Sequence, residues 1–75
     1  MDRHLEAIGL AVTHADLELI PQAIRRAYHH GVPPARGSAA IEIAASRAGV
    51  PASVRAWARA AGQAWARVAH PSLAA

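Results

Sequence analysis

The side chains that could do chemistry in this sequence are few. It contains no cysteine, which excludes disulfides, thiol catalysis and thiolate metal sites within it. His29 and His30 are adjacent, and on a helix they point about 100° apart, so one helix cannot present both to a single metal ion. Glu6, Glu18 and Glu42 could serve as general bases only if a cleft buried them. We therefore expect neither a metal site nor a cofactor.

Basic side chains follow one face of the C-terminal part of the chain. They recur at four-residue steps and are joined by one glutamine: Arg55, Arg59, Gln63 and Arg67. All five acidic residues lie at or before Glu42, so no acidic residue follows these arginines, and the net charge is +3. Such a stripe can contact phosphates or guanines, although a solvated helix face has the same pattern. The stripe is a candidate surface for an anionic partner.

A helix over residues 51–69 is predicted to position this stripe. Its other face is apolar, with hydrophobic residues at three- and four-residue steps: Val54, Trp57, Ala58, Ala61, Trp65 and Val68. Buried aromatic side chains dominate the energetics of cores and interfaces. We therefore expect Trp57 and Trp65, with Val54 and Val68 beside them, to anchor a core or an interface between subunits.

Three further helices are predicted from hydrophobic periodicity and from residues that end helices. They cover residues 3–15, 17–30 and 35–48. Gly31 ends the second helix, and Gly49 followed by Pro51 separates the third from the fourth. The residues of the third helix that we expect inside are Ile41, Ile43, Ala44, Ala45 and Ala48. The chain, residues 1–75, is thus predicted to be a single all-α domain of four helices.

The small size of the chain bears on its assembly. A 75-residue domain has little core, and much of its 53% hydrophobic content is alanine, with no phenylalanine and two tryptophans. Part of its stability is then expected to come from a homo-oligomer. No apolar run is long enough to span a membrane, and the start of the sequence lacks the basic-then-apolar pattern of a signal peptide. The expected location is the cytoplasm.

Two helix boundaries, and the segment between them, have the pattern of a known family. Glu18-Leu19 opens a helix that closes on Gly31-Val32, and the next helix ends in Ala48-Gly49-Val50-Pro51-Ala52. In these features residues 18–61 resemble the carboxymuconolactone decarboxylase and alkylhydroperoxidase D-like family, and residues 6–12 look like the helix that precedes its active centre. Subunits of that family are small and all-helical, and they form trimers or hexamers. The resemblance implies the same fold and an oligomer.

The catalytic groups of that family are not matched. The peroxidase branch uses a Cys-x-x-Cys pair, and the equivalent region here, residues 16–23, has no thiol. The decarboxylase branch places a histidine where this chain has Gln22 or Ala23. It also places a glutamate and a histidine where the gapless register puts Ala39 and Ile43, which cannot move a proton. The resemblance therefore implies a family member that lacks this chemistry and acts through self-association.

Residues 42–60 also resemble a helix-turn-helix unit, which gives an alternative function. The turn would be Gly49-Val50-Pro51, and the following helix would carry the arginine stripe into the major groove of DNA. Two features disfavour this interpretation. The turn is one residue shorter than the common form. The second helix is rich in alanine and carries both tryptophans, which suits packing better than base contacts. Nucleic acid is therefore the alternative partner, behind a second copy of the chain.

Overall fold

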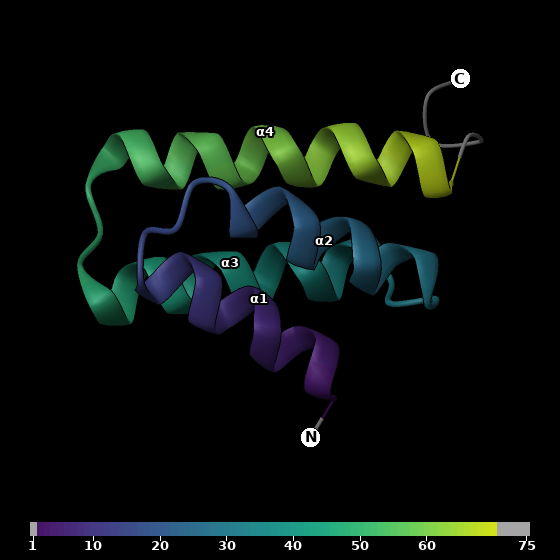
Figure 1. Ribbon diagram of the computed structural model, residues 1–75, viewed down its shortest axis with the longest axis horizontal. Coiled ribbons are helices and arrows are strands. Elements are labelled where there is room, and N and C mark those ends of the chain that lie inside the picture. Colours follow the sequence, from purple (N-terminus) through teal and green to yellow (C-terminus); the bar gives the residue numbers. More distant parts are fainter. Residues whose placement is uncertain (1, 71–75) are drawn as a thin grey trace.

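The computed structural model describes residues 2–70, which form four α-helices and no strand. The helices are α1 (Arg3–Thr13), α2 (Leu19–His29), α3 (Pro34–Ala48) and α4 (Ala52–Ala69) (Figure 1). The prediction of an all-α chain with four helices is confirmed. The connection between α1 and α2 is longer than expected, because α1 ends before residue 15 and α2 begins after residue 17.

Local hydrogen bonds explain where α1 and α2 begin. The carboxylate of Asp2 accepts a hydrogen bond from the backbone N–H of His4 at 2.7 Å and thereby caps α1. The carboxylate of Asp16 accepts one from the N–H of Leu19 at 3.0 Å. Each bond satisfies one of the backbone donors that the first turn of a helix leaves free. Both hydrogen bonds are local and join residues only two or three positions apart.

Each of α1, α2 and α3 is followed by a residue in the left-handed backbone region. Gly31 has a φ of 92° and Gly49 has a φ of 62°, as expected for glycines that follow a helix. The third is Ala15, with a φ of 52°. At this end of α1, the N–H of Asp16 donates to Ala11 O at 3.1 Å, which closes the turn in the manner of a Schellman motif. An alanine therefore occupies a position that favours glycine.

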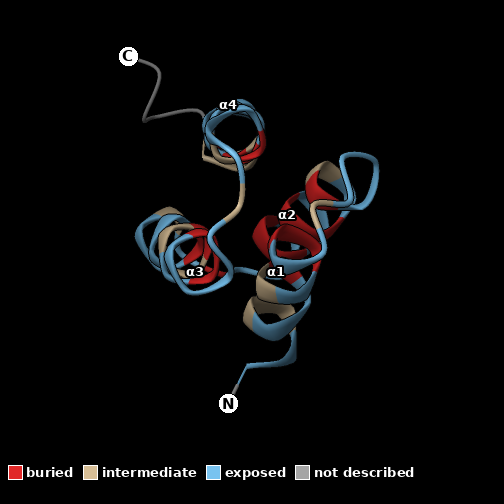
Figure 2. Ribbon diagram, turned by 90° about the vertical axis from the view of Figure 1, so that its left-hand side faces the viewer, coloured by how far each residue is buried: buried red, intermediate tan, exposed pale blue. Residues whose placement is uncertain are grey.

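The four helices surround one apolar core. Around it they follow the order α1, α2, α4, α3, and the diagonal pairs make fewer contacts than the neighbours do. Figure 2 shows the buried faces of the helices turned toward this common centre. The large side chains that are fully buried come from three helices: Ile8, Val12, Ile20, Ile24 and Ile41. α3 and α4 lie side by side and antiparallel, joined at one end by a short connection (Figure 1).

Tyr28 at the end of α2 explains why α3 contains a glycine in its first turns. The tyrosine is buried, and its hydroxyl donates to Pro34 O at 3.4 Å. Burial raises the pKa of this hydroxyl, and a hydrogen bond with Ser38 opposes that rise. A Cβ on Gly37 would lie 2.6 Å from Cε1 and 2.8 Å from Cζ of the tyrosine ring. Gly37, a poor helix former, is therefore needed for packing rather than for backbone freedom.

Candidate functional site

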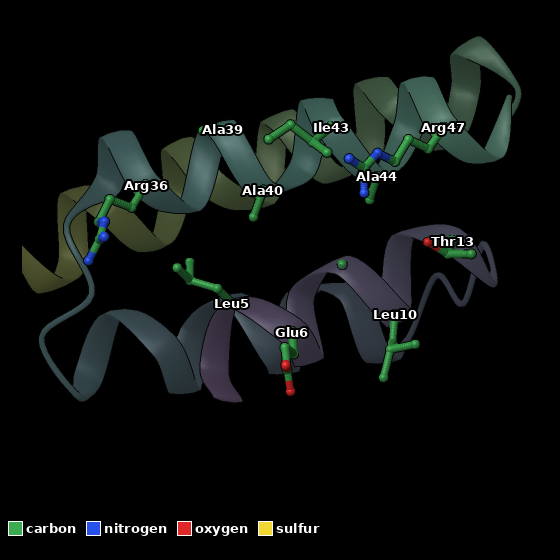
Figure 3. A pocket seen from close by; sticks show the side chains of 11 residues that line it. Leu5, Glu6, Leu10, Thr13, Arg36, Ala39, Ala40, Ile43, Ala44 and Arg47 are labelled. Carbon is green, nitrogen blue, oxygen red and sulfur yellow. The ribbon is translucent and has the colours of Figure 1, made fainter. Parts of the chain in front are cut away.

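A groove lies between α1 and α3 on the described part of the molecule. Its volume is about 650 Å³, and its walls are mostly apolar. α1 contributes Leu5, Glu6, Gly9, Leu10 and Thr13, and α3 contributes Arg36, Ala39, Ala40, Ile43, Ala44 and Arg47. We call this feature the α1/α3 groove. Figure 3 shows the two helices as its opposite walls, with Leu5 and Ala40 directed into the space between them.

Two large apolar side chains of the groove are exposed to solvent. Leu10 is 59% exposed and Ile43 is 54% exposed. The expectation that Ile43 lies inside was wrong, because Ile41 and Ile43 are two residues apart and point about 200° apart on a helix. Ile41 faces the core, so Ile43 must face outward. Ala48, also expected inside, is exposed as well.

The charged groups of the groove are divided between its walls. Glu6 lies on α1, whereas Arg36 and Arg47 lie on α3 (Figure 3). All three side chains are exposed, and the ion pair found among residues 2–70 involves none of them. The groove thus offers one carboxylate, two guanidinium groups and the hydroxyl of Thr13, which is too few proton-transferring groups for paired acid–base chemistry.

A glycine in α1 leaves the groove open. Gly9 lies in the middle of the helix, where glycine costs about 1 kcal/mol relative to alanine. A Cβ at this position would meet no atom within 4 Å. Packing inside one chain therefore does not require a glycine here, in contrast to Gly37. The backbone of α1 is accessible at this point of the groove.

The predicted anchors on α4 have different environments. Val54 is buried in the chain's own core at 7% exposure, so it is not available to a second subunit in this structure. Trp65 packs partly against the same core, and the guanidinium of Arg25 lies 5.6 Å from the centre of its ring. Trp57 is about half exposed, and its indole N–H donates to Leu17 O at 2.8 Å. Val68 is exposed.

Part of the arginine stripe is held by α3. Arg59 forms an ion pair with Glu42, with its Nη2 3.0 Å from Oε2, and the two side chains are 55% and 40% exposed. The hydrogen bonds from Arg59 lower the pKa of Glu42, and in turn Glu42 raises the pKa of Arg59. Arg55 donates to the hydroxyl of Ser46 at 3.4 Å. Glu42 is thus a helix-linking carboxylate at the surface and not a buried general base.

The two helices that could form a helix-turn-helix unit are arranged differently from that motif. In the motif they cross at about 90–120°. Here α3 and α4 run antiparallel in Figure 1, and both are seen nearly end-on in Figure 2. The ion pair of Glu42 with Arg59 joins these two helices along their sides. The arrangement is that of a helical hairpin.

The histidines form no metal site in residues 2–70. No group of three or more histidine, cysteine, aspartate or glutamate side chains is placed to hold an ion there. The rings of His4 and His30 stack with their centres 4.7 Å apart, which joins the start of α1 to the end of α2.

None of the described helices combines the length and apolarity needed to cross a bilayer.

Sequence reasoning missed the α1/α3 groove, although one signal for it is present. The outward positions of α1 and α3 include Leu10 and Ile43, which lie off the stripes that face the core. An apolar residue outside the core stripe is the pattern that could have identified a second apolar face.

Comparison of the chain with protein-family models, with curated proteins and with solved structures finds no match.

Proposed function

We propose that the protein is a non-catalytic helical subunit that acts by self-association, and that the α1/α3 groove is the surface it uses. The observation that carries the proposal is the exposure of Leu10 and Ile43, both more than half accessible, at one groove. A contiguous apolar surface rimmed by polar groups is typical of a protein interaction site. Covering it would remove apolar area from water, which is the main favourable term in association.

The resemblance to the carboxymuconolactone decarboxylase and alkylhydroperoxidase D-like family is consistent with this proposal. The register drawn from that resemblance assigns the family's glutamate and histidine to Ala39 and Ile43. Both residues line the groove, where they supply apolar surface instead of proton transfer. We propose that the chain has a fold of this kind, and that the place of the family's chemistry is taken here by an interface.

Binding of DNA by the arginine stripe has less support. Arg59 is engaged by Glu42, and Arg55 is directed to Ser46. The antiparallel arrangement of α3 and α4 does not present a recognition helix in the way a helix-turn-helix unit does. Salt-dependent binding to duplex DNA that is lost in a variant with Arg55→Ala and Arg67→Ala would favour this alternative.

Two substitutions of matched chemistry test the proposal. Ile43→Glu places a charge in the groove, and Val68→Glu places the same charge on the exposed face of α4; both positions are more than half exposed, so neither change disturbs the core. We expect Ile43→Glu to raise the dissociation constant of the assembly at least about tenfold, because a hydrated carboxylate would replace apolar surface that association removes from water. Val68→Glu should leave it unchanged. Sedimentation equilibrium measures both constants, and the reverse result would transfer the interface to α4.

A further inference from the structure

The charges of the α1/α3 groove have a self-complementary arrangement. The α1 wall carries the acidic Glu6, and the α3 wall carries the basic Arg36 and Arg47. Figure 3 shows Glu6 at a level between the two arginines along the groove. Arg47 follows Arg36 by eleven positions, which places their Cα atoms about 16.5 Å apart along a helix. A group midway between them is therefore about 8 Å along the helix axis from either one.

Most homo-oligomers contain a two-fold axis, and an interface of this kind brings the same patch of both copies together. When two grooves meet face to face, the axis lies in the plane between them, either across the grooves or along them. An axis across the grooves places α1 on α1 and α3 on α3. Glu6 then faces its own copy, and Arg36 faces Arg47 of the partner subunit. Like charges in such positions cost several kcal/mol.

An axis along the grooves gives the opposite result. It places the α1 wall of each copy on the α3 wall of the other. Glu6 then lies over the middle of the partner's α3, between its two arginines, and long guanidinium side chains can approach it from both ends. The exposed Leu10 faces the wall that carries Ile43 of the partner subunit, so the two apolar residues shield each other from water.

We infer that two copies of this chain pair groove to groove about an axis parallel to α1 and α3, with Glu6 of each copy held between Arg36 and Arg47 of the other. The inference rests on the proposed self-association and specifies its partner and register. It assigns a role to three exposed charges that form no ion pair within the described part of the chain. The interface contains two equivalent acidic–basic clusters, one on each side of the axis.

A mixing experiment tests this register. One variant carries Glu6→Arg, so three cations meet at each cluster when it pairs with itself. A second variant carries Arg36→Glu together with Arg47→Glu, so three carboxylates meet. Each variant alone should dimerise at least about tenfold more weakly than the unmodified chain. An equimolar mixture should form heterodimers with a dissociation constant within about threefold of the original, since every cluster again contains opposite charges.

Matched control variants distinguish the effect of the pairing register from a general effect of net charge. Glu18→Arg makes the same charge change as Glu6→Arg at an exposed residue that directly precedes α2. Arg26→Glu with Arg67→Glu does the same for the arginine pair, again on exposed side chains away from the groove. Neither control variant should associate more weakly than the unmodified chain. Mixing the two control variants should not change the strength of their association. Circular dichroism of each variant verifies that the helices form before the association is measured.

The outcomes distinguish the register from the proposed function. If the variants associate like the unmodified chain, or if mixing restores nothing, the inferred register is overturned. Self-association through the groove would still stand in that case, provided that Ile43→Glu weakens it. If the unmodified chain does not associate and instead an acidic peptide binds the groove, both the register and the proposed function are overturned.

Discussion

Gly37 shows how a single residue can be explained only by its contacts. Helix propensity alone favours alanine over glycine at this position by about 1 kcal/mol. The ring of Tyr28, buried at 3% exposure, fills the space that a side chain would need. The sequence identifies Gly37 as an unfavourable residue near a helix start, but it cannot reveal which side chain lies against it, because the contact crosses from α2 to α3.

We predict that Gly37→Ala destabilises the protein by about 1–3 kcal/mol, the usual cost of forcing extra volume into a packed site. Gly9→Ala is the matched control, since a Cβ there meets nothing within 4 Å. The control should leave stability unchanged or raise it by up to about 1 kcal/mol. Urea unfolding followed by circular dichroism measures both. Equal effects of the two substitutions would contradict the packing role assigned to Tyr28.

Ala15 has the opposite character, because its backbone favours glycine. Its φ of 52° is a left-handed conformation that costs an L-residue about 1–2 kcal/mol. We predict that Ala15→Gly stabilises the protein by about 0.5–1 kcal/mol, the strain relief being partly offset by the greater freedom of glycine in the unfolded chain. Ala7→Gly, on an exposed position inside α1, should instead destabilise by about 0.5–1 kcal/mol. Thermal unfolding of the two variants should shift in opposite directions.

At the scale of elements, the ion pair between Glu42 and Arg59 joins α3 to α4. Arg59 holds the pKa of the Glu42 carboxyl below its ordinary value, chiefly by hydrogen bonding. Since the folded state binds this proton less tightly than the unfolded chain does, the pair stabilises the fold fully above the ordinary glutamate pKa of about 4.3. The contribution is lost as the pH falls through the lowered pKa.

We predict that Glu42→Gln lowers the melting temperature slightly at pH 7, and that the difference from the unmodified chain disappears as the pH falls below about 4. Glu18→Gln is the control, because Glu18 is exposed and takes no part in that ion pair. The difference in melting temperature between Glu18→Gln and the unmodified chain should not disappear over the same pH range. Melting curves of the three proteins between neutral and acidic pH provide the measurement, and a constant deficit of Glu42→Gln across that range would contradict the account.

Much of the element structure could be predicted from the sequence. Local signals such as Gly31, Gly49 and Pro51 mark helix boundaries, because the conformation of a chain at these points depends on neighbouring residues. The end of α1 was placed too late because Ala15 carries no such signal. The inward position of Ile43 was predicted wrongly because apolar character alone does not say which of two helix faces meets the core.

At the scale of the whole molecule, the four helices cover one core but leave the α1/α3 groove open. Its position could not be predicted, because it depends on which helices become neighbours, and that is decided by contacts far apart in the sequence. The arginine stripe, which the sequence does display, is partly occupied by Glu42 and Ser46. We propose the apolar groove as an interface in addition to the predicted face of α4, on which Trp57 and Val68 are exposed.

The mass of the unmodified protein in solution is the most direct measure of self-association. Sedimentation equilibrium over a wide range of concentration should give a mass that rises from the chain mass of 7.8 kDa to at least twice that value. The same measurement on Ile43→Glu should remain near the mass of one chain at concentrations where the unmodified protein is associated. A mass of one chain for the unmodified protein at every concentration would contradict the central claim.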